Sequence, residues 1–277
     1  MKNGKKGDQR PLSSSLPAVP ETTSATIGKH TPIYVGTCGW DYPDWKPLLY
    51  GDSPRGHWLT LYSHRFPAVE VDSSFYRRPR AETYHRWAEA TPPDFAFALK
   101  GHRFVTHVKR LLHPEESLRL QLEDASPLTS KLKTFLWQLP AAFRKDLARL
   151  ESFAQALTKV KGPARHVLEF RHPSWFDPEV ASLLGHYRIG SCQSDAADWP
   201  LWDAVTTDLV FVRLHGAEVT YVSSYSENEL ASWAERIRTW HREARTVHLY
   251  FDNTAGGAAV ENALTLLSLL SATESYG

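Results

Sequence analysis

Two carboxylates, Glu70 and Asp72, alternate with Val69 and Val71 in the segment 68–72. In an extended chain this spacing places both carboxylates on one face and both valines on the other. Carboxylates side by side can act as general acids and bases, or as ligands. In a strand that is buried on both faces they are costly unless they are paired or bound. This segment is therefore the first candidate for a functional site.

Charged and amide residues recur where other short apolar segments end. Six of eight such segments carry one on or near the face that would point inward. A purely structural interior would avoid this pattern, because each unpaired buried charge costs several kcal/mol. The residues are Glu70 and Asp72, Lys100, Gln138, Glu169 and Arg171, Arg213 and His215, and Asp252 and Asn253.

The apolar segments alternate with segments of helical periodicity, which implies a parallel α/β sheet. The predicted strands are 33–37, 69–72, 95–100, 135–139, 166–171, 188–193, 209–215 and 247–252. The predicted helices are 58–66, 81–90, 105–122, 147–160, 178–184, 229–241 and 256–270. Eight units match a single (β/α)8 TIM barrel, whose usual length is about 250 residues. The sixth unit is irregular, because 194–208 predicts a loop rather than a helix. A doubly wound sheet is the alternative, but no glycine-rich dinucleotide fingerprint follows the first strand.

The N-terminal segment differs in composition from the rest of the chain. Residues 1–30 are rich in Lys, Gly, Ser, Thr and Pro and predict a disordered tail, which leaves 31–272 as the barrel domain. The tail lacks the apolar core of a secretory signal, and no apolar run reaches the roughly 20 residues that span a bilayer. We therefore expect a cytoplasmic protein without a membrane partner.

Net charge and cysteine content add little about function. The formal net charge of the 277-residue chain is +1, so bulk charge predicts neither a nucleic-acid partner nor a membrane surface. Cys38 and Cys192 form no disulfide framework and have no metal-type spacing. We interpret them as small buried residues, with a nucleophilic Cys38 at the end of the first strand as the alternative.

In a TIM barrel the strand ends meet at one mouth, where active sites are found. We predict catalytic acid–base roles there for Glu70, Glu169, His215 and Asp252. Lys100, Arg171 and Arg213 would bind an anion, and Asn253 would orient the substrate. The alternative is an ionic cluster that satisfies itself. In that case Glu169 would pair with Arg171 or Arg213, and Glu70 would pair with Lys100.

A basic lip on the rim is the second candidate feature. The segments 77–80 and 100–110 contain seven Lys and Arg residues and no acidic residue. The lip is either a solvated surface or a docking patch for phosphate or a nucleic-acid backbone. Aromatic residues on adjacent loops would stack bases or sugars, or would form loop cores; they are Trp40, Tyr42, Trp45, Phe75 and Tyr76.

No cofactor is predicted. A divalent metal is a weaker alternative, since carboxylates and one histidine on converging strands suit Mg²⁺, Mn²⁺ or Zn²⁺. Lys100, Arg171 and Arg213, expected at the same strand ends, would compete with a metal for the carboxylates. No HxH or HExxH spacing occurs. No metal ligand is therefore assigned.

Seven motifs in order resemble the signature of the domain-of-unknown-function 72 (YecE-like) family over residues 33–270. They read VGTCGWDYPDW, VEVDSSFYRRP, FALKGHRFVTH, WQLP, LEFRHPSW, VRLHG and YFDNTAGGAAVENA. The resemblance implies a (β/α)8 barrel and no established activity. It implies polar site positions at Glu70, Tyr76, Lys100, His107, Gln138, Glu169, Arg171, Arg213, His215, Asn253 and Asn262. This chain departs from the pattern at Asp72 and Asp252, where the family usually has Asn, and both departures add negative charge.

The preferred function is an enzyme with an acid–base site at the barrel mouth. Its substrate would be polar and phosphate-bearing, and the reaction would be hydrolysis of a phosphoester or nucleic acid. Substrate-binding roles fall to Tyr76, Lys100, His107, Gln138, Arg171, Arg213, Asn253 and Asn262. A non-catalytic nucleic-acid-binding protein and a small-molecule-binding scaffold are the alternatives. The sequence does not separate hydrolase from isomerase and does not give the oligomeric state.

Overall fold

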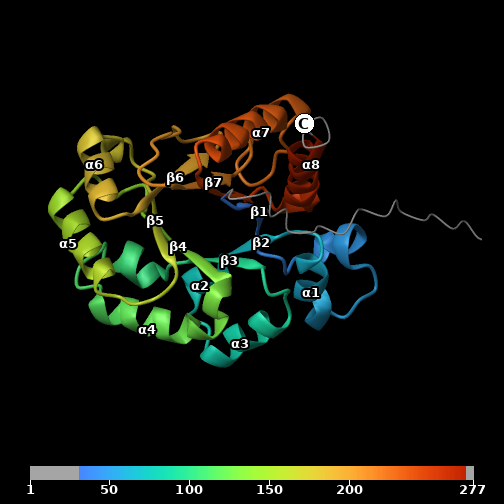
Figure 1. Ribbon diagram of the computed structural model, residues 1–277, viewed down its shortest axis with the longest axis horizontal. Helices are drawn as coiled ribbons and strands as arrows, with labels where there is room; N and C mark the ends of the chain where they lie inside the picture. Colours follow the sequence, from blue (N-terminus) through green and yellow to red (C-terminus); the bar gives the residue numbers. More distant parts are fainter. Residues whose placement is uncertain (1–30, 273–277) are drawn as a thin grey trace, which may run out of the picture.

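The computed structural model describes residues 31–272, which form a closed barrel of eight parallel strands (Figure 1). Each strand pairs with its neighbours in sequence, and β1 closes the barrel against β8. The strands are β1 Ile33–Cys38, β2 Ala68–Val71, β3 Ala96–Lys100, β4 Leu132–Gln138, β5 Arg165–Glu169, β6 Gly190–Asp195, β7 Leu209–Leu214 and β8 Thr246–Phe251. The predicted TIM barrel is confirmed. The predicted disordered tail, residues 1–30, lies outside the described residues.

Helices cover the outside of the barrel (Figure 1). Several begin at side-chain caps, such as Asp177 before α6 and the Ser226–Glu229 capping box before α7. No helix joins β6 to β7, as the irregular sixth unit predicted. The helices are α1 Trp58–Ser63, α2 Ser73–Tyr76, α3 Ala81–Glu89, α4 Glu115–Ala125, α5 Leu147–Thr158, α6 Pro178–His186, α7 Glu227–Arg242 and α8 Ala258–Ala272.

The predicted helix 105–122 is wrong in its first half. A single π-helical turn, Phe104–Val108, follows β3, and α4 begins only after Pro114. Between them Arg110, Leu111 and His113 have positive φ angles, which an α-helix cannot contain. The apolar spacing arises because Val105 and Leu111 are buried by a loop that turns back on itself.

Apolar side chains fill two separate layers. The larger layer lies between the strands and the helices, and the smaller one fills the barrel interior. On β3 the inward face carries Ala96 and Ala98 below Lys100, and on β7 it carries Phe211 below Arg213. Small side chains on one wall therefore leave room for large ones from the opposite wall.

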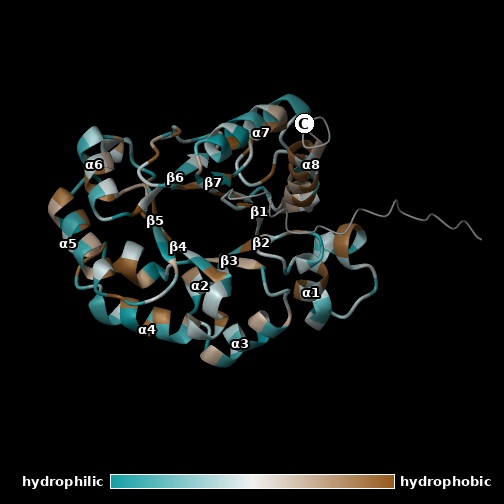
Figure 2. Ribbon diagram, viewed as in Figure 1, coloured by the Kyte–Doolittle hydropathy of each residue, from teal (hydrophilic) through white to brown (hydrophobic). Residues whose placement is uncertain are grey.

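Helix α8 is long and apolar enough by composition to resemble a membrane span, over Ala255–Ala272. Figure 2 shows it as a largely hydrophobic helix, whereas α4 carries many hydrophilic residues. Val260, Ala263 and Leu266 are buried, and α8 packs against β1, β8 and α7. It is therefore a covering helix of the barrel. The expected cytoplasmic location stays a prediction.

The Gly101→Ala substitution should destabilise the fold. Gly101 follows β3 directly, and a Cβ atom there would lie 2.1 Å from the indole of buried Trp137. The ring sits in a packed core, so relief of the overlap should cost about 1–3 kcal/mol. Thermal unfolding would measure this. Gly162→Ala, where a Cβ meets only Leu122 at 3.5 Å, is the matched control. Equal melting temperatures for the two variants would contradict the prediction.

Candidate functional site

The guanidinium of Arg213 lies fully buried at the centre of the barrel mouth. Its Nε and Nη2 donate to the two carboxylate oxygens of Glu70, at 3.0 and 2.9 Å. Nη2 also donates to Asp252 at 2.9 Å, and Nη1 donates to Glu169 and His215 at 3.0 Å each. All five N–H groups of the guanidinium thus have acceptors.

Three further charged residues surround this centre. Lys100 Nζ lies 3.2 Å from Asp72 Oδ1, and the same oxygen lies 3.6 Å from Arg213. Arg171 donates from Nε to Glu169 and lies 3.1 Å from His215 Nε2. We call the set the strand-end cluster; its members are Glu70, Asp72, Lys100, Glu169, Arg171, Arg213, His215 and Asp252.

The cluster forms because strands from all sides of the barrel end at one level. In the paired strands Glu70 lies beside Cys38, and Arg213 lies beside Ser194 and Tyr250. The members point inward because they alternate with residues such as Val71 and Val212 that face the helices. The predicted convergence of ionic side chains is thus what the structure shows.

One expected pair differs from the structure. Lys100 does not pair with Glu70 but with Asp72, which shares its side of the mouth. Glu70 instead pairs with Arg213, which reaches it from β7 on the opposite wall. The two expected partners of Glu169 are both present, since Arg171 and Arg213 each contact it.

Two carboxyls of the strand-end cluster have raised pKa values. Burial raises the pKa of Glu70 to about 8 and that of Asp252 to about 6, although Arg213 opposes both shifts. Four carboxylates face three cations in the strand-end cluster, and Glu70 and Asp252 both approach Arg213 Nη2 at 2.9 Å. One proton on this pair makes the cluster neutral, so we assign a carboxylic acid to it near neutral pH.

Glu169 and His215 have fixed protonation states. Burial raises the pKa of Glu169, but Arg171 and Arg213 outweigh that effect and hold it well below its usual range. Guanidinium groups only donate hydrogen bonds, so His215 Nε2 accepts from both arginines and carries no proton. Burial and the same two cations hold the pKa of His215 well below its usual value. Glu169 is therefore a permanent anion and His215 a neutral ring.

Only part of the cluster reaches the surface. The side chains of Lys100 and Asp252 are each 10% exposed and that of Arg171 is 9% exposed, whereas those of Glu70, Glu169, Arg213 and His215 are fully buried. The buried members form the floor of the site. Lys100, Arg171 and Asp252, together with the more open Asp72, are the groups that a substrate can touch.

The loop between β6 and β7 covers part of this opening. The indole of Trp199 stacks on Arg171, with the guanidinium carbon 3.7 Å from the ring centroid. Its N–H donates to Ser194 Oγ at 3.1 Å, and Ser194 donates in turn to Glu169 at 3.0 Å. Sequence reasoning missed Ser194 and Trp199, because neither is charged and Trp199 lies in an aperiodic loop.

Five predicted substrate-binding residues lie outside the cluster. Asn253 and Asn262 are hydrogen-bonded to each other and to the backbone of the loop after β7, so they hold that loop in place. Gln138 is hydrogen-bonded to the Leu139 carbonyl. Tyr76 and His107 lie on the rim, where Tyr76 is 66% exposed.

The cysteines and two of the five loop aromatics are structural. Burial and nearby carboxylates raise the pKa of Cys38 well above its usual value, which keeps the thiol protonated. Trp45 is buried and donates to the Thr254 carbonyl, and Tyr42 donates to the Cys38 carbonyl. These two rings are therefore occupied in loop cores and are not free to stack bases.

The rim has two lips of opposite charge, on opposite sides of the barrel. The basic lip after β2 and β3 exposes Arg77, Arg103, Lys109 and Arg110, while Arg78 pairs with Asp124 at 2.5 Å. The acidic lip after β6 and β7 exposes Asp198, Asp203 and Glu218, and the segments 196–208 and 216–226 contain no Lys or Arg. Large apolar side chains are exposed on both lips, including Phe104, Val108, Val219 and Tyr221.

Among residues 31–272, no group of three or more His, Cys, Asp and Glu side chains is arranged to hold a metal ion. The carboxylates at the mouth are held by Lys100, Arg171 and Arg213. These cations occupy the positions from which a divalent ion would contact the carboxylate oxygens.

Comparison with known proteins places this architecture in a family. The sequence profile described as "Protein of unknown function DUF72" matches residues 34–276. The chain belongs to this family. The DUF72 relative UPF0759 protein YunF of Bacillus subtilis is 27% identical over 274 residues, which cover 86% of this chain and 94% of YunF. UPF0759 protein YecE of Escherichia coli is 31% identical over 145 residues, 52% of this chain and 50% of YecE.

Solved DUF72 structures share the barrel. A DUF72 family protein from Thermotoga maritima superposes with a TM-score of 0.77 at 29% identity, over 87% of this chain and 99% of that one. One from Enterococcus faecalis has a TM-score of 0.70 at 24% identity, over 87% and 98% of the two chains, a likeness of fold alone. The DUF72 description assigns no activity, so the chemistry has to come from the geometry of the site.

The Glu70→Gln substitution tests the protonation of the DUF72 site. The unfolded chain loses the Glu70 proton near pH 4.5 and the folded protein near pH 8. The stability that Glu70 contributes is therefore fully present below the lower value and is lost as pH rises toward the upper one. Gln carries no such proton. We expect the melting temperature of the variant, relative to wild type, to rise between about pH 5 and about pH 9.

Thermal unfolding across this pH range would measure the difference. Glu82→Gln, at an exposed position on α3, controls for the loss of one carboxylate outside the cluster. A wild-type-minus-variant difference for Glu70→Gln that stays constant with pH would show that Glu70 does not hold the proton.

Proposed function

We propose that this barrel is an enzyme that acts on a phosphate-bearing substrate at the mouth. The Glu70–Asp252 pair supplies the proton, and Lys100 and Arg171 contact the anion. One observation carries the proposal. Glu70 and Asp252, two carboxyls whose pKa values burial raises, lie at the same opening as two slightly exposed cations. Water attacks the phosphorus and loses a proton to solvent as the bond to the leaving oxygen breaks. A positioned acid protonates that oxygen, while fixed cations stabilise the charge on the phosphoryl group.

The electrostatics of the rim support an anion on the β3 side. His107 lies there with its ring against Phe75, and Lys100 lies 4.9 Å from the same Phe75 ring. Burial, Lys100, Arg103 and other cations lower the pKa of His107 to about 4. Burial is the largest cause of this depression, and the smaller effect of the cations reflects a local positive potential, which favours a phosphate group next to Lys100.

The proposal assigns different roles to residues that the sequence groups together. Glu169 and His215 position the guanidinium groups rather than transfer protons, because both have fixed protonation states. Arg213 acts as the centre of the frame, since its N–H groups are all engaged. Asp252 is the less deeply buried member of the acid–base pair and delivers the proton at the mouth.

A non-catalytic nucleic-acid-binding protein is the second candidate. The exposed cations Arg77, Arg103, Lys109 and Arg110, with Tyr76 and Phe104 among them, favour contact with a phosphate backbone along the basic lip. The acidic lip opposite repels such a backbone, so contact would be confined to one side of the mouth. A small-molecule scaffold would bind phosphate esters at the same site without turnover.

The Asp252→Asn substitution tests catalysis. It removes the exposed acid and keeps the side-chain volume. The fold should tolerate it, because the amide oxygen of Asn can still accept the hydrogen bond from Arg213 Nη2. We expect turnover of phosphate mono- or diesters, measured as release of the alcohol, to fall about 100-fold or more. Asp198→Asn on the acidic lip is the control and should leave turnover unchanged.

The outcomes separate the candidates. Loss of turnover with an unchanged melting temperature supports the acid role. Turnover that survives Asp252→Asn but disappears in Glu70→Gln would place the proton on Glu70 alone. Absence of turnover by the wild type across the ester panel would favour the binding protein or the scaffold.

Anion binding has a separate readout in His107. We expect inorganic phosphate to raise the pKa of His107 from about 4, because a bound anion offsets the cations around the ring. Titration of the histidine resonances by NMR, with and without phosphate, would measure the shift. Lys100→Met should abolish the effect of phosphate, and exposed His85 on α3 should not respond. A phosphate-independent pKa of His107 would remove Lys100 as an anion contact.

A further inference from the structure

A cavity of about 710 Å³ lies outside the barrel wall, beside the mouth. It is bounded by the loop after β1, the start of α1, the end of β2 and the second half of α3. Its volume falls within the range of about 300–1,000 Å³ that is usual for small-molecule sites. Neither the acid–base pair nor its anion contacts occupy this space.

The walls of the cavity are mainly apolar and aromatic. Trp40 from the β1 loop and Trp87 from α3 both line it, with ring centroids 5.2 Å apart and ring planes perpendicular. Leu59, Val71 and Ala90 complete the apolar lining. Both tryptophans are only partly buried, so each offers ring surface that is still open to a ligand. Aromatic rings prefer edge-to-face or offset contact with other aromatic groups, which favours a planar ring system here.

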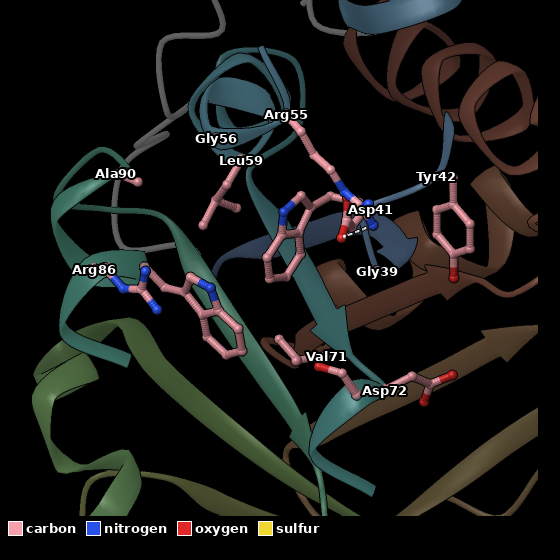
Figure 3. A pocket seen from close by; sticks show the side chains of 13 residues that line it. Gly39, Asp41, Tyr42, Arg55, Gly56, Leu59, Val71, Asp72, Arg86 and Ala90 are labelled. Carbon is pink, nitrogen blue, oxygen red and sulfur yellow. Dashed lines mark hydrogen bonds and ion pairs between the residues drawn. The ribbon is translucent and has the colours of Figure 1, made fainter. Parts of the chain in front are cut away.

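Charged groups stand at the edges of the cavity. Asp41 and Arg55 form an ion pair with Oδ1 and Nε 2.6 Å apart, so this pair is neutral as a unit. Arg86 extends from α3, and its Nη2 donates a long hydrogen bond of 3.4 Å to Thr83 Oγ1. Figure 3 shows Leu59, Arg86 and the Asp41–Arg55 pair around one space, with Asp72 directed away from it toward the strands.

Asp72 joins this cavity to the catalytic mouth. It is the lining residue that also belongs to the strand-end cluster, and its Oδ1 lies 3.2 Å from Lys100 Nζ. A phosphate on Lys100 therefore lies next to the entrance of the cavity. A substrate with its anion at Lys100 can extend the remainder of the molecule past Asp72 toward Trp40 and Trp87.

We infer that this cavity binds an aromatic ring carried by the phosphate-bearing substrate, and so selects aryl or nucleoside-like phosphates over small aliphatic ones. The inference rests on the proposed function for the anion, but the ring site is defined by its own residues. The ring packs on the two indoles, and the phosphate reaches Lys100 and Arg171 across Asp72.

Gly56 allows the cavity to be blocked without removing a packed side chain. It lines the cavity, and a Cβ atom built on it meets nothing within 4 Å. Gly56→Phe should therefore fill the ring site and leave the core intact. Gly162→Phe is the matched control, because it adds an exposed ring in the turn before β5, and Gly162 does not line the cavity.

The experiment compares three probes by calorimetry on the full chain: 1-naphthyl phosphate, glycerol phosphate and neutral 1-naphthol. We expect wild type and Gly162→Phe to bind naphthyl phosphate at least tenfold more tightly than glycerol phosphate. Gly56→Phe should remove this preference and leave the Kd for glycerol phosphate unchanged. Trp87→Phe should keep most of the preference, because it retains a ring at the same place.

Three results would overturn the inference, and the first two are equal affinity of the wild type for the two phosphates and a preference that survives Gly56→Phe. A mass that changes between wild type and Gly56→Phe in sedimentation would also overturn it, because a second copy would then fill the cavity. Binding of 1-naphthol that Gly56→Phe abolishes, without binding of either phosphate, would keep the ring site and reject the proposed anion site. The two failures are thus distinguishable.

Discussion

The buried guanidinium of Arg213 is the constraint on which the mouth of this barrel depends. Moving a cation out of water costs several kcal/mol unless each of its N–H groups has an acceptor and its charge is paired with an anion. Here carboxylates from β2, β5 and the end of β8 and the lone pair of His215 provide the match. Such a cluster is weak evidence for stability, since apolar residues of the same volume can replace one at little cost. The cluster instead fixes the positions of its members, because each side chain can reach the N–H groups of Arg213 from only one position.

That order separates a fixed floor from a small reactive surface. Glu169 and His215 are held in single protonation states by the two arginines. The cluster holds one carboxylate more than cations, and burial raises the pKa values of Glu70 and Asp252, so we expect one of these two to hold a proton near neutral pH. The fully buried members therefore hold the others in position, and in the proposed site the slightly exposed Lys100, Arg171 and Asp252 contact the substrate.

Charged residues on the rim of the barrel are also separated by sign. A net charge of +1 conceals a basic lip on one side of the mouth and an acidic lip on the other. Any large partner at the mouth meets both signs, whereas a small anion meets only the side it approaches. The cavity beside β2 adds an apolar, largely aromatic surface next to the basic side.

The sequence by itself determined the barrel and the inward face of the strands that carry the polar cluster, because a period of two residues is local and independent of the partner strand. It failed in the segment after β3, where buried Val105 and Leu111 imitate a helix although positive φ angles break it. For the alternative of an ionic cluster that satisfies itself, the sequence also led us to pair Glu70 with the wrong cation, Lys100. Only the tertiary structure decided that Glu70 meets Arg213 across the barrel and that Trp199 covers Arg171. Those contacts depend on strand register and loop closure, which join residues far apart in the chain and leave no periodic signal.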